Sequence, residues 1–183
     1  TDLEAIRKIL FPNYPNAIPY ITSYYDKISG FCMDHETYKS LKEDEYEVLI
    51  NSEHFLGSMT IGECVLEGET KEEVLISSYL CHPSMGNNEL SGPIVLTYLY
   101  DALKKQKNKY TYRFVIFPET IGAIAYLSYS YEKLKDKINY GLVLTCLGGP
   151  TQNISYKESR LGNSGFDNFI KKSGNINIRE FTP

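Results

Sequence analysis

The chain has 183 residues, of which 42% are hydrophobic and 23% charged, and its formal net charge is −4. A chain of this length and composition can bury one sizeable core, which predicts a single domain over 1–183. The acidic balance argues against a nucleic-acid partner, and the lack of any apolar run long enough to span a bilayer argues against a membrane.

The first third of the chain predicts little regular structure. A short helix is expected over 2–10, capped by Asp2, and a second short helix over 34–42. Between them the segment "FPNYPNAIPY" holds three prolines, which break regular structure. Partly alternating apolar residues then predict strands over 45–52 and 58–68.

From residue 72 onward the pattern changes to strands that alternate with helices. The expected strands cover 72–80, 110–118 and 139–149, the expected helices cover 93–106 and 120–137, and a further helix and an edge strand are expected within 166–181. This alternation predicts an α/β fold, a mostly parallel mixed sheet with helices on both faces. In such sheets the functional residues lie at the carboxyl ends of the strands. The loops 81–92, 118–122 and 145–150 are expected at this edge.

Two residues in these loops have side chains suited to chemistry. His82 follows a strand, and imidazole is a common zinc ligand. Glu119 follows the next strand, where a carboxylate can act as general base or metal ligand. Each also has an ordinary interpretation, a loop histidine bonded to backbone and a glutamate favoured by a helix dipole. Glu89 is interpreted as a solvated loop charge, and Cys81 and Cys146 as buried, inert thiols.

Taken together, several segments resemble a known family: "EVLISSYLCHPS", "NNELSG", "YRFVIFPETIGAIAYLS", "GLVLTCLG" and "YKESRLGN". They are similar to the co-catalytic zinc aminopeptidases of clan MH, and more closely to a bacterial aminopeptidase-like family of unknown function. The resemblance spans roughly 17–165. It implies a zinc-exopeptidase-like fold, one or two zinc ions, a metal-activated water, and a peptide or small amide as substrate.

The resemblance also implies roles for individual residues. His82 matches a metal ligand, Asn88 stands on the position of the bridging aspartate, and Glu119 matches the general base. Thr120 replaces a metal-binding glutamate, as is usual in the bacterial branch. A third ligand, an aspartate in the clan, would fall near Cys146.

Asn88 departs from the family at the position of the ligand that bridges the two metal ions. A co-catalytic metal pair needs an anionic bridge with two oxygens, whereas an asparagine is neutral and has one oxygen acceptor. His82, Asn88 and Glu119 bring only one formal negative charge, so the zinc site is incomplete as it stands. The family also has an inserted domain near 13–16 and a further C-terminal part, so the chain is expected to be a partial member.

Three functions therefore remain open. The favoured one is a metal-dependent aminopeptidase-like hydrolase; the others are a degenerate relative that binds a ligand or partner without turnover, and a one-metal hydrolase that uses Glu119 as a ligand. Lys157 and Arg160 could hold a substrate carboxylate or phosphate, although ordinary surface charges would look the same.

Two features of the composition bear on the cellular location and the oligomeric state of the protein. Four cysteines without CxxC spacing are typical of reduced thiols, which predicts a cytoplasmic protein. The tyrosine-rich N-terminal portion, poor in regular structure, could pack on a partner subunit, which would make the protein a homo-oligomer, or on a missing domain.

Overall fold

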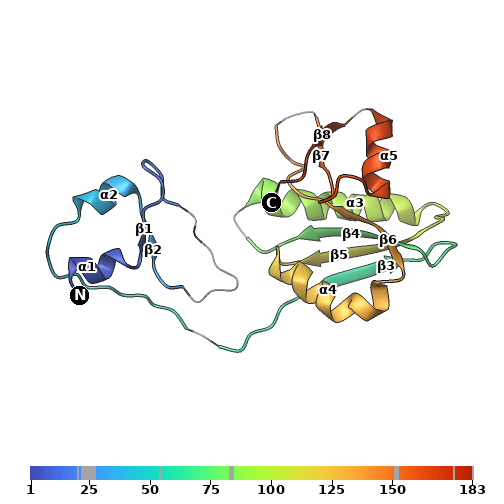
Figure 1. Ribbon diagram of the computed structural model, residues 1–183. Helices are drawn as coiled ribbons and strands as arrows, with labels where there is room; N and C mark the ends of the chain where they lie inside the picture. Colours follow the sequence, from blue (N-terminus) through green and yellow to red (C-terminus); the bar gives the residue numbers. More distant parts are fainter. Residues whose placement is uncertain are drawn as a thin grey trace. The chain divides into compact units, whose positions relative to one another are not determined.

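The computed structural model describes residues 1–19, 21, 28–53, 55–82, 85–150, 153–174 and 176–182. The chain divides into two compact units, Thr1–Leu56 and Gly57–Pro183. The elements of the predicted α/β sheet lie in the second unit (Figure 1). The expectation of a single aminopeptidase-like domain over 1–183 stays a prediction.

The first unit contains two short helices and one pair of short parallel strands. Its elements are α1 (Leu3–Arg7), β1 (Leu10–Phe11), β2 (Phe31–Cys32) and α2 (His35–Ser40). Asp2 caps α1 by accepting a hydrogen bond from the Ala5 amide at 2.8 Å, and Asp34 caps α2 by accepting one from the Thr37 amide at 2.8 Å. Such caps satisfy amides that have no partner inside the helix. The predicted helix over 2–10 is thus confirmed in part, because α1 ends at Arg7.

The segment 45–52 forms no strand, so that prediction was wrong. Tyr46 and Val48 pack against the core of α1 and β1, which accounts for the alternation in the sequence. The backbone of Tyr46 exchanges two hydrogen bonds with Thr1, at 2.8 and 3.0 Å. Alternating apolar residues indicate that every second side chain packs against the protein, as the half-buried Tyr46 and Val48 do, and they do not require a neighbouring strand.

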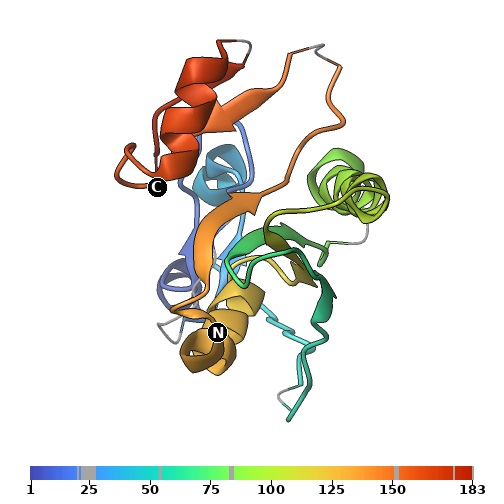
Figure 2. The same cartoon turned by 90° about the vertical axis from the view of Figure 1, so that its right-hand side faces the viewer.

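The second unit is built around a four-stranded sheet. Its elements are β3 (Gly62–Leu66), β4 (Glu73–Tyr79), the π-helical turn η1 (Gly86–Leu90), α3 (Ser91–Lys104), β5 (Thr111–Phe117), α4 (Ile121–Leu134), β6 (Ile138–Val143), β7 (Ser155–Lys157), α5 (Gly165–Ser173) and β8 (Asn177–Arg179). The strand order is β3-β5-β4-β6, in which β4 runs parallel to both neighbours and β3 runs antiparallel to β5. Helix α3 covers one face of this sheet and α4 the other (Figures 1 and 2). The predicted α/β fold, with a mostly parallel mixed sheet and helices on both faces, is confirmed.

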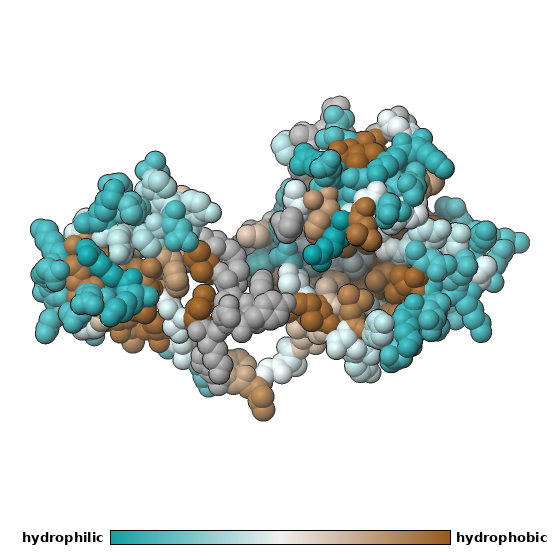
Figure 3. Space-filling view, in the orientation of Figure 1, coloured by the Kyte–Doolittle hydropathy of each residue, from teal (hydrophilic) through white to brown (hydrophobic). Residues whose placement is uncertain are grey.

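Side chains of β5 supply the core on both faces of the sheet. Val115 packs with Tyr126 of α4 on one face, and Phe114 packs with Leu96 of α3 on the other. Successive residues of a strand point to opposite faces, so one buried strand can serve two layers. Apolar side chains also remain exposed, and Figure 3 shows them as brown patches separated by polar side chains. None of the described helices is long and apolar enough to cross a bilayer.

Helix α3 approaches the sheet so closely in its first turn that position 92 requires glycine. A Cβ atom on Gly92 would lie 2.3 Å from the Leu144 carbonyl oxygen and 2.3 Å from Ser78 Oγ. We expect Gly92→Ala to lower the free energy of unfolding by about 1–3 kcal/mol, because α3 must move away from the sheet. Denaturant titration measures this. The control is Gly86→Ala, where a Cβ meets nothing within 4 Å; equal losses from both variants would contradict the packing argument.

The C-terminal part of the second unit is organised by a buried carboxylate. Asp167 accepts hydrogen bonds from the Tyr156 hydroxyl at 2.8 Å, the Ser159 amide at 2.9 Å and the Ser164 amide at 2.7 Å. Burial by itself raises the pKa of Asp167, but these hydrogen bonds outweigh it and hold the pKa well below its ordinary value. The ionised carboxylate therefore ties β7 to the start of α5, the helix expected near the C-terminus. The expected edge strand is β8, which pairs with β7.

Candidate metal centre

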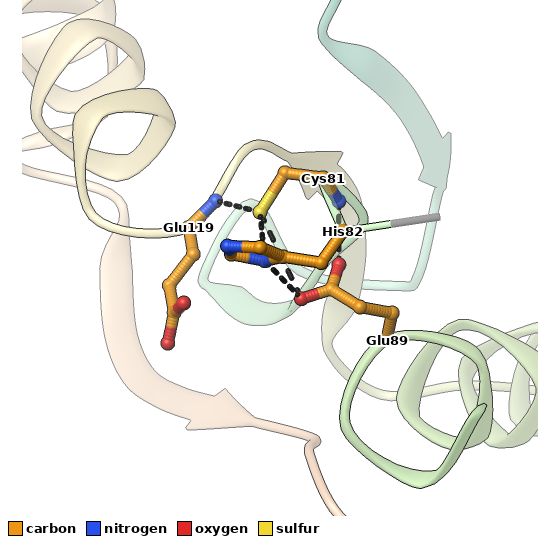
Figure 4. Close-up of side chains that lie close together, drawn as sticks. All are labelled: Cys81, His82, Glu89 and Glu119. Carbon is orange, nitrogen blue, oxygen red and sulfur yellow. Dashed lines mark hydrogen bonds and ion pairs between the residues drawn. The ribbon is translucent and has the colours of Figure 1, made fainter. Parts of the chain in front are cut away.

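Four side chains meet at the carboxyl ends of β4 and β5. Cys81 and His82 follow β4, Glu119 follows β5, and Glu89 comes from η1 at the start of α3. One ligand atom from each of the four lies within 4.8 Å of the others (Figure 4). The structure thus brings together His82 and Glu119, the two residues that the sheet topology placed at this edge.

The expectation that Glu89 is a solvated loop charge was wrong. Glu89 is 0% exposed rather than solvated. Its carboxylate accepts hydrogen bonds from the Cys81 amide at 2.5 Å and from His82 Nδ1 at 2.8 Å. Burial alone would raise the pKa of Glu89, but these hydrogen bonds outweigh it, so the pKa is lower than usual and the group is anionic at neutral pH.

The inward direction of Glu89 comes from the π-helical turn that carries it. Turns of this kind are rare and occur often at functional sites. Residues of η1 follow neither the period of an α-helix nor that of a strand. No periodic signal in the sequence could therefore have shown that Glu89 is buried.

The sulfur of Cys81 lies among the other three residues, although the residue as a whole is exposed. It is 3.1 Å from His82 Nδ1 and 3.8 Å from Glu89 Oε1, and it accepts a hydrogen bond from the Glu119 amide at 3.3 Å. Burial of the sulfur raises the pKa of the thiol, and the charge of Glu89 raises it further. The thiol is therefore not an activated nucleophile in this arrangement. The expectation that Cys81 and Cys146 are buried was wrong, because both are exposed.

Glu119 is positioned by a strained turn between β5 and α4. Thr120 has φ 56° and ψ −68°, and the Ile121 amide donates to the Glu119 carbonyl at 2.6 Å. This is a γ-turn of the rare, strained hand. Cys146, in the loop after β6, is also a non-glycine residue with positive φ, at 53°. Backbone strain in two loops of one sheet edge is typical of a functional site.

Asn88, predicted as a metal ligand, faces the loop that follows β6. Its amide nitrogen donates to Cys146 Sγ at 3.7 Å, while its Oδ1 is buried and has no hydrogen-bond partner among the described residues. A buried carbonyl oxygen rarely lacks a partner, so this atom is available to water or to a cation. Ser91 also holds this loop, because its Oγ accepts from the Leu147 amide at 2.8 Å.

Lys157 and Arg160, predicted to bind substrate, lie on a different segment from the four clustered residues. Both line a pocket of ≈ 700 Å³ between β6 and the β7–α5 segment. The Lys157 ammonium donates to the Thr182 carbonyl at 2.6 Å and lies 5.5 Å from the centre of the Phe181 ring. The role of Lys157 and Arg160 in binding a substrate stays a prediction.

Comparison with known proteins places these features in a family. Residues 12–182 match the family model described as a domain of unknown function, DUF4910. A Clostridium acetobutylicum protein named "Putative polysaccharide biosynthesis protein with aminopeptidase-like domain" is 44% identical over 161 residues, 88% of this chain and 37% of that protein. The crystal structure of a "putative peptidase" from Clostridium acetobutylicum matches with a TM-score of 0.71 and 40% identity, over 100% of this chain and 44% of that one. The chain spans less than half the length of these two relatives, and both names support a peptidase-like protein.

Proposed function

We propose that this chain, which belongs to the DUF4910 family, carries the active site of a metal-dependent aminopeptidase-like hydrolase that cleaves peptide or amide bonds. The observation that carries the proposal is the gathering of Cys81, His82, Glu89 and Glu119 at the carboxyl edge of the sheet. The names of the two relatives support a peptidase-like activity.

The donor atoms at this edge fit a divalent transition cation such as zinc. Zinc is bound in proteins by imidazole nitrogen, thiolate sulfur and carboxylate oxygen, and this cluster offers all three. His82 and Asn88 are the proposed ligands from the sequence, and the buried Oδ1 of Asn88 lacks a partner among the described residues. Glu89 adds a second, buried negative charge to that of Glu119. When bound, the cation would polarise the scissile carbonyl and lower the pKa of the attacking water.

The other groups of the chain would handle the proton and the substrate. Glu119 would take the proton from the attacking water and deliver it to the leaving amine, as a general base and then a general acid. The strained turn centred on Thr120 follows Glu119 directly. Lys157 and Arg160 stay candidates for holding a substrate carboxylate.

Metal content distinguishes this function from its alternatives. We expect the wild-type chain, purified without chelator, to contain zinc by elemental analysis, and His82→Ala to lose it. The matched control is His35→Ala, which removes an imidazole from the first unit and should leave the zinc content unchanged. Asn88→Asp should raise the content toward two ions per chain, because a carboxylate can bridge a metal pair and an amide cannot.

A second function is favoured by one observation, the neutral side chain at position 88. A wild type that binds no metal, beside an Asn88→Asp variant that does, would contradict the hydrolase. It would support instead a peptidase-like fold that binds a ligand without turnover.

A further inference from the structure

We propose that Cys81, His82 and Glu89 together bind a single cation, with the Cys81 sulfur as a thiolate ligand, and that Glu119 stands beside the fourth, open position. This inference rests on the proposed function and deepens it. It assigns the ligands differently from the resemblance stated above, in which neither a cysteine nor the residue at position 89 binds metal.

The distances among the three donor atoms favour this ligand set. Sγ to Nδ1 is 3.1 Å, Nδ1 to Oε1 is 2.8 Å, and Sγ to Oε1 is 3.8 Å. Neighbouring ligand atoms around a tetrahedral zinc lie about 3.4–3.6 Å apart, from bond lengths of about 2.0–2.3 Å. The three atoms therefore need shifts of only a few tenths of an ångström to surround one cation.

Two of the three ligands, Glu89 and Cys81, are also held by backbone amides. The second carboxylate oxygen of Glu89 accepts from the Cys81 amide at 2.5 Å, and the Cys81 sulfur accepts from the Glu119 amide at 3.3 Å. Cys81 and His82 come shortly after the end of β4, one of the two central strands of the sheet. Contacts that orient ligands in this way raise metal affinity.

The same three ligands also balance the charge of the cation. A thiolate and a carboxylate together neutralise a divalent cation, whereas His82, Asn88 and Glu119 offer one negative charge between them. On binding, the Cys81 thiol releases its proton to solvent, and His82 coordinates through Nδ1 with a proton on Nε2. Catalytic zinc sites commonly have three protein ligands and one open position. Glu119 then remains free to act as the base.

Titration of the whole chain with Co²⁺ tests the proposal, because a thiolate ligand gives Co²⁺ an intense near-ultraviolet charge-transfer band. We expect this band in the wild type and its loss in Cys81→Ser. Affinity should fall by at least the roughly 10–100-fold that follows loss of an outer-sphere partner. The matched control is Cys64→Ser, which removes an exposed thiol from β3 and should keep the band.

Two further variants separate ligand loss from misfolding. Cys81→Asp should bind Co²⁺ without the band, because a carboxylate replaces the sulfur, and Glu89→Gln should keep the band with weaker binding. Co²⁺ that binds the wild type without the band, or keeps the band in Cys81→Ser, would overturn the thiolate ligand and leave the proposed function standing. A wild type that binds no Co²⁺ would overturn both.

Discussion

Replacing Arg113 with methionine is expected to lower the free energy of unfolding of the second unit by about 3–5 kcal/mol. Arg113 is 3% exposed and its partner Glu73 is 4% exposed. The guanidinium donates from Nε to Glu73 Oε2 at 2.6 Å and from Nη2 to Oε1 at 3.0 Å, which makes a paired contact across β5 and β4. Removal of the arginine leaves the buried Glu73 carboxylate without its cation.

The direction of the Arg113 pKa agrees with this assignment. Hydrogen bonding to Glu73 raises the pKa of Arg113 above its ordinary value, although burial acts against it. The guanidinium also donates to Glu63, whose other oxygen accepts from the Tyr126 hydroxyl at 2.7 Å. The pair is therefore part of a network that joins β3, β4, β5 and α4.

A double variant separates the pair from the packing around it. Arg113→Met combined with Glu73→Leu should recover most of the lost stability, because no buried carboxylate is then left without its cation, and Glu63, which also pairs with Arg113, is exposed. The surface control is Lys105→Met, which removes the exposed partner of Asp101 on α3 and should cost about 1 kcal/mol or less. Denaturant titration of the wild type and of the three variants measures the change in the free energy of unfolding of each. A loss below about 1 kcal/mol in Arg113→Met would contradict a buried, paired charge.

Replacing Glu119 with glutamine is expected to lower kcat about 10²–10⁴-fold on a peptide or aminoacyl amide that the wild type hydrolyses. The amide has nearly the shape of the carboxylate but cannot take a proton from water. Because Glu119 is proposed as a base and not a ligand, metal content should stay unchanged. The measurement is therefore initial rates together with elemental analysis of the same sample.

The control for this variant is Glu132→Gln, an exposed carboxylate on α4 paired with Lys135. It should leave the rate unchanged. A Glu119→Gln chain that loses its metal along with its activity would identify Glu119 as a ligand, as in the one-metal alternative. A chain that keeps nearly full activity would remove Glu119 from the chemistry.

Much of the α/β architecture could be predicted from the sequence. The expected strands over 72–80 and 110–118 agree with β4 and β5 to within one residue at each end. Buried strands and covering helices leave local periodic signals, and parallel strands bring their carboxyl ends to one edge. For that reason His82 and Glu119, 37 positions apart in the chain, could be expected at the same edge before any distance was known.

The sequence by itself determined the sheet, the two helical layers and the edge at which polar residues meet. Only the tertiary structure decided which charged residues are buried. Arg113 and Glu73 are 40 positions apart, and Glu89 reaches His82 through a π-helical turn. A charged side chain can be buried only where the fold supplies its partner, and the identity of that partner depends on contacts between distant segments that no local pattern records.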